Sequence, residues 1–143
     1  MGVVKAVCTS NIKGIQKTEQ DAIELKSDWG IEGDAHGGPW HRQVSLLSSE
    51  QVEAFKARGA DVGHGSFGEN IVVEGFDLKS LPIGTRFACG DVVLELTQIG
   101  KQCHAHCAIY HQVGDCIMPR EGVFCKVIEG GTIAPGDAIE IAQ

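Results

Sequence analysis

The chain has 143 residues, with 43% hydrophobic residues, 22% charged residues and a formal net charge of −7. This length favours one domain over residues 1–143 with its own hydrophobic core, and the acidic charge disfavours nucleic-acid binding, which needs a basic face. The sequence contains no apolar run of about 18 residues that would predict a transmembrane helix, and its N-terminus lacks the features of a signal peptide. We therefore expect a cytoplasmic protein with neither a nucleic-acid nor a membrane partner.

Short apolar or alternating runs separated by turn residues predict the strands. Glycine supports this interpretation, because 19 of the residues are Gly against an average usage of about 7%, and glycine favours tight turns. In chain order the expected strands are Val3–Thr9, Ala22–Lys26, Gln43–Leu47, Ile71–Val73, a pair of strands within residues 81–100, Gly122–Ile128 and Ala138–Ala142.

One segment has a clear helical pattern. Ser48 and Gln51 fit a capping box before Ser49–Arg58, and Gly59 suits a left-handed helix stop. A second short helix is expected over residues 104–113. A parallel βαβ fold would need a helix after most strands. The pattern instead predicts a mainly β barrel of about seven or eight short strands with one or two short helices.

Two glycine-rich loops carry polar residues that could bind a ligand, because glycine lets the backbone approach a ligand closely. Asp34 and His36 lie in the first loop, and Glu69 and Asn70 close the second. The alternative is local, since Asp and Asn side chains also stabilise turns by bonding neighbouring backbone groups. The pattern alone leaves both interpretations open.

Residues 99–125 concentrate sulfur and imidazole, with four of the six cysteines and three of the six histidines. The spacing of Cys103 and Cys107 falls within the range for adjacent zinc ligands. Cys116 and Cys125 could complete a four-sulfur site for structural zinc, with His104 or His106 as substitutes, although the pattern is loose and no C-x-x-C pair is present. Alternatively, Cys103 is a reactive thiol, because Lys101 and His104 beside it would favour the thiolate. Disulfides are disfavoured in a reducing compartment.

For three of the cysteines a simpler interpretation is favoured. Cys8, Cys89 and Cys125 lie in apolar strand patterns, and free cysteine is among the most buried residue types. Arg42 and Arg120 each stand beside a candidate loop, and arginine is a natural bidentate partner of phosphate. Each could equally form a surface ion pair.

Several stretches taken in order resemble the MOSC domain, the C-terminal domain of molybdenum cofactor sulfurases, which also occurs as small stand-alone bacterial proteins. The matching stretches are GIEGDAHGG, RQVSLLSSE, GSFGENIVVEG, LPIGTRFACGDVVLELTQIGKQCH and GDCIMPREGVFCKVIEGG. The resemblance implies a MOSC-like β-barrel. It also implies molybdenum cofactor (molybdopterin) binding, with Cys103 carrying a persulfide or ligating molybdenum.

From the residues and the resemblance together, we expect a module that binds this cofactor or carries sulfur for it. The expected cofactor-binding residues are Asp34, His36, Arg42, Glu69, Asn70, Lys101, His104 and Arg120, and the expected metal ligands are Cys103, Cys107 and Cys116.

Larger relatives of this family also carry a pyridoxal-phosphate-binding desulfurase domain or a reductase domain. We expect neither in this chain. Its expected partners are therefore molybdenum cofactor biosynthesis proteins or molybdoenzymes, with a desulfurase as sulfur donor, and whether the chain is itself a sulfurtransferase-like enzyme is left open. Two alternatives remain: a component of a molybdenum-dependent reductase of N-hydroxylated substrates, and a zinc-stabilised interaction module.

Overall fold

Strand β8 (Val92–Ile99) shows how the apolar pattern builds the sheet. Val92, Leu94 and Leu96 are buried, whereas the residues between them are partly exposed, as expected for a strand with one face in the core. The computed structural model describes residues 2–12, 16–57, 59, 63–100 and 122–142. Across these residues the buried apolar side chains form one main cluster inside the sheet.

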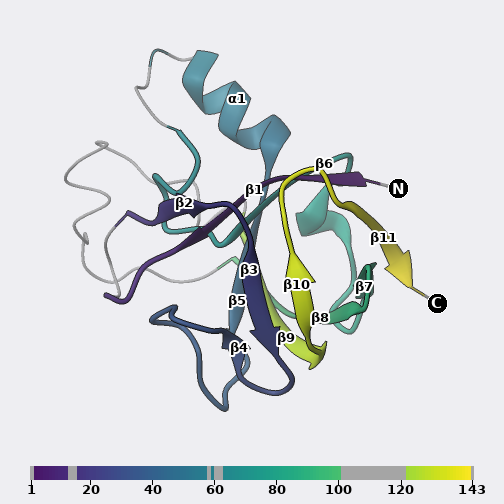
Figure 1. Cartoon of the computed structure of the whole chain (residues 1–143). Helices are drawn as coiled ribbons and strands as arrows, with labels where there is room; N and C mark the ends of the chain where they lie inside the picture. The colour runs from purple at the N-terminus through teal and green to yellow at the C-terminus, as the bar shows by residue number, and fades with distance from the viewer. Residues whose placement is uncertain (1, 13–15, 58, 60–62, 101–121, 143) are drawn as a thin grey trace.

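Seven strands close into a barrel (Figure 1). Their order is β11-β7-β8-β9-β5-β6-β1, and β11 pairs with β1 to complete the ring. The bounds of these strands are β1 Gly2–Thr9, β5 Val44–Ser48, β6 Ile71–Glu74, β7 Arg86–Cys89, β8 Val92–Ile99, β9 Val123–Glu129 and β11 Ala138–Ala142. Closure leaves the ring without unpaired edges, and it confirms the expected mainly β barrel.

Short elements extend the barrel, and the sequence pattern missed most of them. Strand β2 (Thr18–Gln20) pairs with β1, and β10 (Gly131–Ile133), β3 (Ile23–Lys26) and β4 (Gly30–Ile31) form a separate three-stranded sheet. A 3₁₀ turn, η1, spans Leu78–Ser80. These elements are two to four residues long, which is too short for β2, β4 and β10 to show a period.

Helix α1 (Ser49–Ala57) connects β5 to β6, which are parallel. Parallel neighbours need a crossover, so the molecule contains one βαβ unit that the sequence interpretation did not include. The helix begins where predicted. The Ser48 hydroxyl donates to the Glu50 carboxylate at 3.0 Å, whereas in a capping box its oxygen would accept from the backbone N–H of Gln51. Gly59 has φ +95°, which confirms the left-handed stop.

Among the described helices, none combines the length and the apolar character that crossing a bilayer requires. The second helix expected over residues 104–113 lies outside the described residues.

Candidate functional site

The loop between β4 and β5 carries three of the predicted site residues, Asp34, His36 and Arg42. Glu69 and Asn70 lie directly before β6. The other predicted residues lie outside the described part of the chain: Lys101, Cys103, His104, Cys107, Cys116 and Arg120. The first loop is therefore where the geometry of the candidate site can be built.

Asp34 is the buried centre of this loop, and its side chain is inaccessible to solvent. Its carboxylate accepts from the backbone N–H of Ser10 at 3.1 Å, from Lys17 Nζ at 2.7 Å and from the backbone N–H of His36 at 3.0 Å. Burial acts to raise the pKa of Asp34, but the contacts with His36, Lys17 and Ser10 outweigh it and hold that pKa well below its usual range. Asp34 is therefore a fixed anion at neutral pH.

Lys17 is a site residue that sequence reasoning missed. Its side chain is 1% exposed, and its Nζ lies 2.7 Å from Asp34 Oδ1 and 3.1 Å from Nδ1 of His36. Gln16 and Thr18 on either side are exposed, so the polar segment gives no sign that the lysine between them is buried. An acidic partner would have indicated that Lys17 is buried, but this partner, Asp34, lies 17 positions away in the sequence.

Lys17 also joins the two glycine-rich loops. Its backbone N–H donates to the carbonyl oxygen of Gly65 at 2.8 Å. At Gly65, φ is +87°, and a Cβ there would lie 2.1 Å from the carbonyl oxygen of Lys17. Glycine is therefore required at this close approach, and the second loop holds the residue that pairs with Asp34 in the first.

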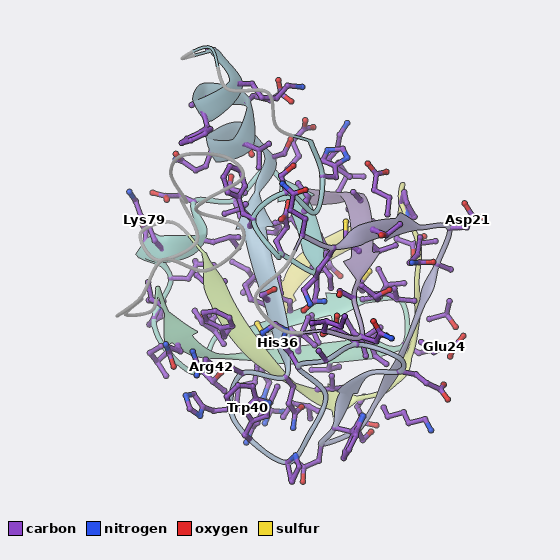
Figure 2. The ribbon with its side chains drawn as sticks, turned by 90° about the vertical axis from the view of Figure 1, so that its left-hand side faces the viewer. Asp21, Glu24, His36, Trp40, Arg42 and Lys79 are labelled. Atoms are coloured by element: carbon purple, nitrogen blue, oxygen red, sulfur yellow. The ribbon has the colours of Figure 1, made fainter. Side chains whose placement is uncertain are left out.

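His36, Trp40 and Arg42 form a stack on the first loop. The rings of His36 and Trp40 are parallel, with centroids 6.4 Å apart, and Trp40 Nε1 donates to the His36 carbonyl oxygen at 2.7 Å. The Arg42 guanidinium carbon lies 4.7 Å from the centroid of Trp40 and 5.6 Å from that of Phe124. Figure 2 shows the three labelled side chains together on one part of the surface, away from Lys79, Asp21 and Glu24.

The Arg42 guanidinium is held by aromatic rings. Its Nε is buried and has no hydrogen-bond partner among the described residues. Leaving a buried N–H without a partner is costly. The stack thus contains a donor that a ligand or a residue outside the described part of the chain could satisfy.

The same loop is bonded to the end of strand β8. His41 Nε2 lies 2.7 Å from Gln98 Oε1, and the Thr97 hydroxyl donates to the His41 carbonyl oxygen. Gln98 in turn donates to the carbonyl oxygen of Gly100 at 2.8 Å. Gly100 is the last described residue before the cysteine-rich segment, and its N–H donates to Gly122 across the base of that segment at 2.7 Å.

The second glycine-rich loop is organised around its own polar side chains. The Glu69 carboxylate accepts from the backbone N–H groups of Gly65 and Phe67 at 2.9 and 3.1 Å. Asn70 accepts from the backbone N–H and hydroxyl of Ser45 and donates to the carbonyl oxygen of Cys8. Both residues are fully buried. These contacts favour the turn-stabilising alternative, and cofactor binding by Glu69 and Asn70 stays a prediction.

The three described cysteines lie in the core, as predicted. Cys8, Cys89 and Cys125 are at most 1% exposed. Burial raises the pKa of Cys8 to about 12 and that of Cys89 to about 11, and it raises the pKa of Cys125 as well. None of the three is a thiolate at neutral pH, so none suits nucleophilic chemistry.

Metal ligands do not converge in the described ranges, where no group of three or more His, Cys, Asp or Glu residues is placed to hold an ion. A hollow of about 500 Å³ lies at the start of α1, between Ser48, Glu50, Phe76 and Lys79 among others. It contains none of the predicted site residues.

Comparisons with known proteins agree with this architecture. A protein called YuaD from Bacillus subtilis has a similar structure, with a TM-score of 0.81 and 20% identity, over 99% of this chain and 96% of that one. YiiM from Escherichia coli matches with a TM-score of 0.73 and 18% identity, over 100% of this chain and 70% of that one. YiiM from Geobacillus stearothermophilus matches with a TM-score of 0.69 and 19% identity, over 99% of this chain and 73% of that one.

At these identities the structural likeness shows the fold alone. A comparison with curated proteins found no match. The sequence itself, however, matches the MOSC domain over residues 32–140, which includes both glycine-rich loops and the cysteine-rich segment. The chain therefore belongs to the MOSC domain family, which is associated with molybdenum cofactor binding and with sulfur-related proteins.

Proposed function

We propose that this protein binds the molybdenum cofactor or carries sulfur for it, with Cys103 as the reactive thiol. One observation carries the proposal: the loop with Asp34, His36 and Arg42 is bonded to the strand end that leads into Cys103. Cys103 follows Gly100 by three residues, and this chain length allows at most about 11 Å between their Cα atoms.

The described residues fit an anionic cofactor. The cofactor carries a phosphate, and the protein has a net charge of −7, so the binding site must concentrate cations and N–H donors. Arg42 has a buried Nε without a protein partner in the described residues, and the partly exposed His36 stacks on the same Trp40 ring that Arg42 contacts. When bound, the cofactor would supply a molybdenum centre, which accepts soft thiolate sulfur.

Sulfur transfer needs a donor and a nucleophile. A Cys103 thiolate would attack the terminal sulfur of a donor persulfide, so that a new S–S bond forms, the donor S–S bond breaks and the donor leaves as a thiolate. A desulfurase is the class of protein that supplies such a persulfide. Molybdenum cofactor biosynthesis proteins or molybdoenzymes would then accept the sulfur. Lys101 and His104 are the neighbours predicted to favour the thiolate.

Substitution of two cysteines tests this proposal. Cys103→Ser should abolish persulfide labelling after incubation with a persulfide donor, and it should abolish retention of the cofactor. Cys8→Ser is the control, because Cys8 is buried and its pKa is about 12. Equal loss in both variants, or no loss in Cys103→Ser, would contradict the role of Cys103.

A further inference from the structure

The contacts of His36 hold one edge of its ring inside the protein. Lys17 Nζ lies 3.1 Å from Nδ1, and Asp34 Oδ2 lies 3.5 Å from the same atom. The side chain is 21% exposed. No partner of Nε2 is found in the part of the chain that the structure describes. The two nitrogens of this ring are therefore in different surroundings.

The two contacts of Nδ1 require opposite positions of the proton. Toward Lys17, Nδ1 must accept, because an ammonium group carries donors only. Toward Asp34 it would have to donate, but 3.5 Å is beyond the usual range of an N–H···O bond. Asp34 Oδ2 already accepts from the His36 backbone N–H at 3.0 Å. Moreover, a proton on Nδ1 would point at the ammonium, so acceptance from Lys17 prevails.

The buried charges support the same assignment. Lys17 and Asp34 are 1% and 0% exposed, and they are 2.7 Å apart. A buried ammonium is stable only when its donors are satisfied. Asp34 takes one of them, and Nδ1 of His36 is the acceptor for another.

From this geometry we infer that Lys17 is a positioning residue, which fixes His36 as the tautomer with its proton on Nε2 and thereby presents an N–H donor to an oxyanion such as phosphate. The ligand class follows from what surrounds this donor. His36 stacks on Trp40, and the Arg42 guanidinium lies over the same indole. An N–H donor and a guanidinium therefore lie on the same indole, and both are groups that bind anionic oxygen.

This assignment deepens the proposed function and rests on it for the identity of the ligand, but the tautomer can be measured without any cofactor. Long-range ¹H–¹⁵N spectra of the ligand-free protein at neutral pH distinguish a protonated nitrogen from an accepting one. For His36 we expect Nε2 protonated and Nδ1 accepting. A proton on Nδ1 would overturn the inference and would leave the role of Cys103 untouched.

Two lysine variants test whether Lys17 sets the tautomer. In Lys17→Met, the signals of His36 should shift toward the form with its proton on Nδ1, since the ammonium is gone and Asp34 remains. Lys26→Met is the matched control, because Lys26 is an exposed lysine 3.6 Å from Glu32, and it should leave His36 unchanged. Unchanged His36 signals in a folded Lys17→Met variant would overturn the positioning role. Should that variant not fold, the wild-type spectrum alone decides.

Titration with inorganic phosphate tests the ligand class in the same spectra. The Nε2–H signal of His36 should shift and saturate, whereas the signals of His64, which pairs with Glu19 at 3.1 Å, should not. A response of His64 equal to that of His36, or none from His36, would overturn the assignment of an oxyanion ligand. The Cys103→Ser variant should respond as the wild type does, so failure here is distinguishable from failure of the sulfur-carrier proposal.

Discussion

Asp34 and Glu69 are both buried carboxylates in glycine-rich loops, yet the protein shifts their pKa values in opposite directions. Lys17 and His36 surround Asp34, and its pKa is lowered. Burial dominates at Glu69, which accepts from the backbone N–H groups of Gly65 and Phe67, and its pKa is raised. The difference is the set of contacts at Asp34, where His36, the Lys17 cation and the Ser10 backbone together favour the charged form of the carboxyl group.

This contrast separates the roles of the two loops. The first holds a fixed charge pair next to partly exposed donors, an arrangement that can meet a ligand. The second uses its polar side chains to hold its own backbone and, through Gly65, the backbone of Lys17. We therefore expect substitutions in the first loop to change binding and those in the second to change stability, with Lys17 as the link between them.

Removal of Lys17 should have the largest effect on stability. Lys17→Met leaves the Asp34 carboxylate buried without its cation, which typically costs about 3–5 kcal/mol of unfolding free energy. The double variant Lys17→Met/Asp34→Asn should recover part of the loss, because the uncompensated charge is gone. Chemical denaturation measures both.

Lys26→Met is the control for this comparison. Lys26 and Glu32 are about 60% exposed, and exposed ion pairs contribute little to the free energy of unfolding. A Lys17→Met variant as stable as Lys26→Met would show that the pair at Asp34 does not hold the first loop.

Removal of Arg42 should change binding more than stability. An anionic ligand that loses a charge-assisted hydrogen bond loses about 1.5–3 kcal/mol, or roughly tenfold to a hundredfold in affinity. Arg120→Ala is predicted to act in the same way. Titration of the cofactor against each variant measures the loss.

The matched control for Arg42 is Arg86→Ala, because Arg86 is a half-exposed arginine on β7 that pairs with Glu95 at 3.2 Å. It should bind like the wild type. If Arg42→Ala and Arg120→Ala bind as tightly as Arg86→Ala, the first loop does not receive the ligand.

The two carboxylates should also give opposite dependences of stability on pH. Because the folded pKa of Glu69 lies above its ordinary value of 4.5, the folded state holds this proton more tightly, and stability falls as the pH rises above that value. For Asp34 the sign is reversed: its lowered pKa gives stability that is present above its ordinary value of 3.8 and is lost as the pH falls.

Glu69→Gln isolates the first of these effects. The stability advantage of the wild type over this variant should shrink as the pH rises above the ordinary value of 4.5, by at most about 1.4 kcal/mol per pH unit. Denaturation curves across this range measure it. An advantage that grows with pH would mean that the pKa of Glu69 is not raised.

Chelation should have the smallest effect. If Cys103, Cys107 and Cys116 held a structural zinc ion, its removal would cost folding free energy directly. We expect little change in Tm with a chelator. A fall of many degrees, together with stoichiometric zinc, would favour the zinc-stabilised interaction module.

The sequence predicted those parts of the fold that follow local patterns. Alternation in Val93–Thr97 located a strand, Gly59 located the end of α1, and the apolar surroundings of Cys8 and Cys89 placed them in the core. Strands of two or three residues, such as Gly30–Ile31, carry no measurable period. They form because long-range pairing holds them, and no local pattern reports that pairing.

The candidate site was predictable to the same degree. The glycine-rich, charged first loop led us to predict Asp34, His36 and Arg42 as site residues. In the structure these residues lie around Trp40 and Lys17. Lys17 was not found, because its burial arises from a contact between distant residues. The sequence could not decide whether Glu69 holds its turn or faces a ligand, since both uses need the same residue type.

Elemental and pterin analysis of the full chain tests the proposed function most directly. The protein would be purified from a host that makes the molybdenum cofactor, and molybdenum, zinc, iron and pterin fluorescence would be measured for the wild type and for Cys103→Ser. We predict molybdenum and pterin in equal amounts with the wild type, and neither with the variant. The proposed function would be contradicted if the wild type held stoichiometric zinc without molybdenum or pterin and also gained no persulfide from a donor.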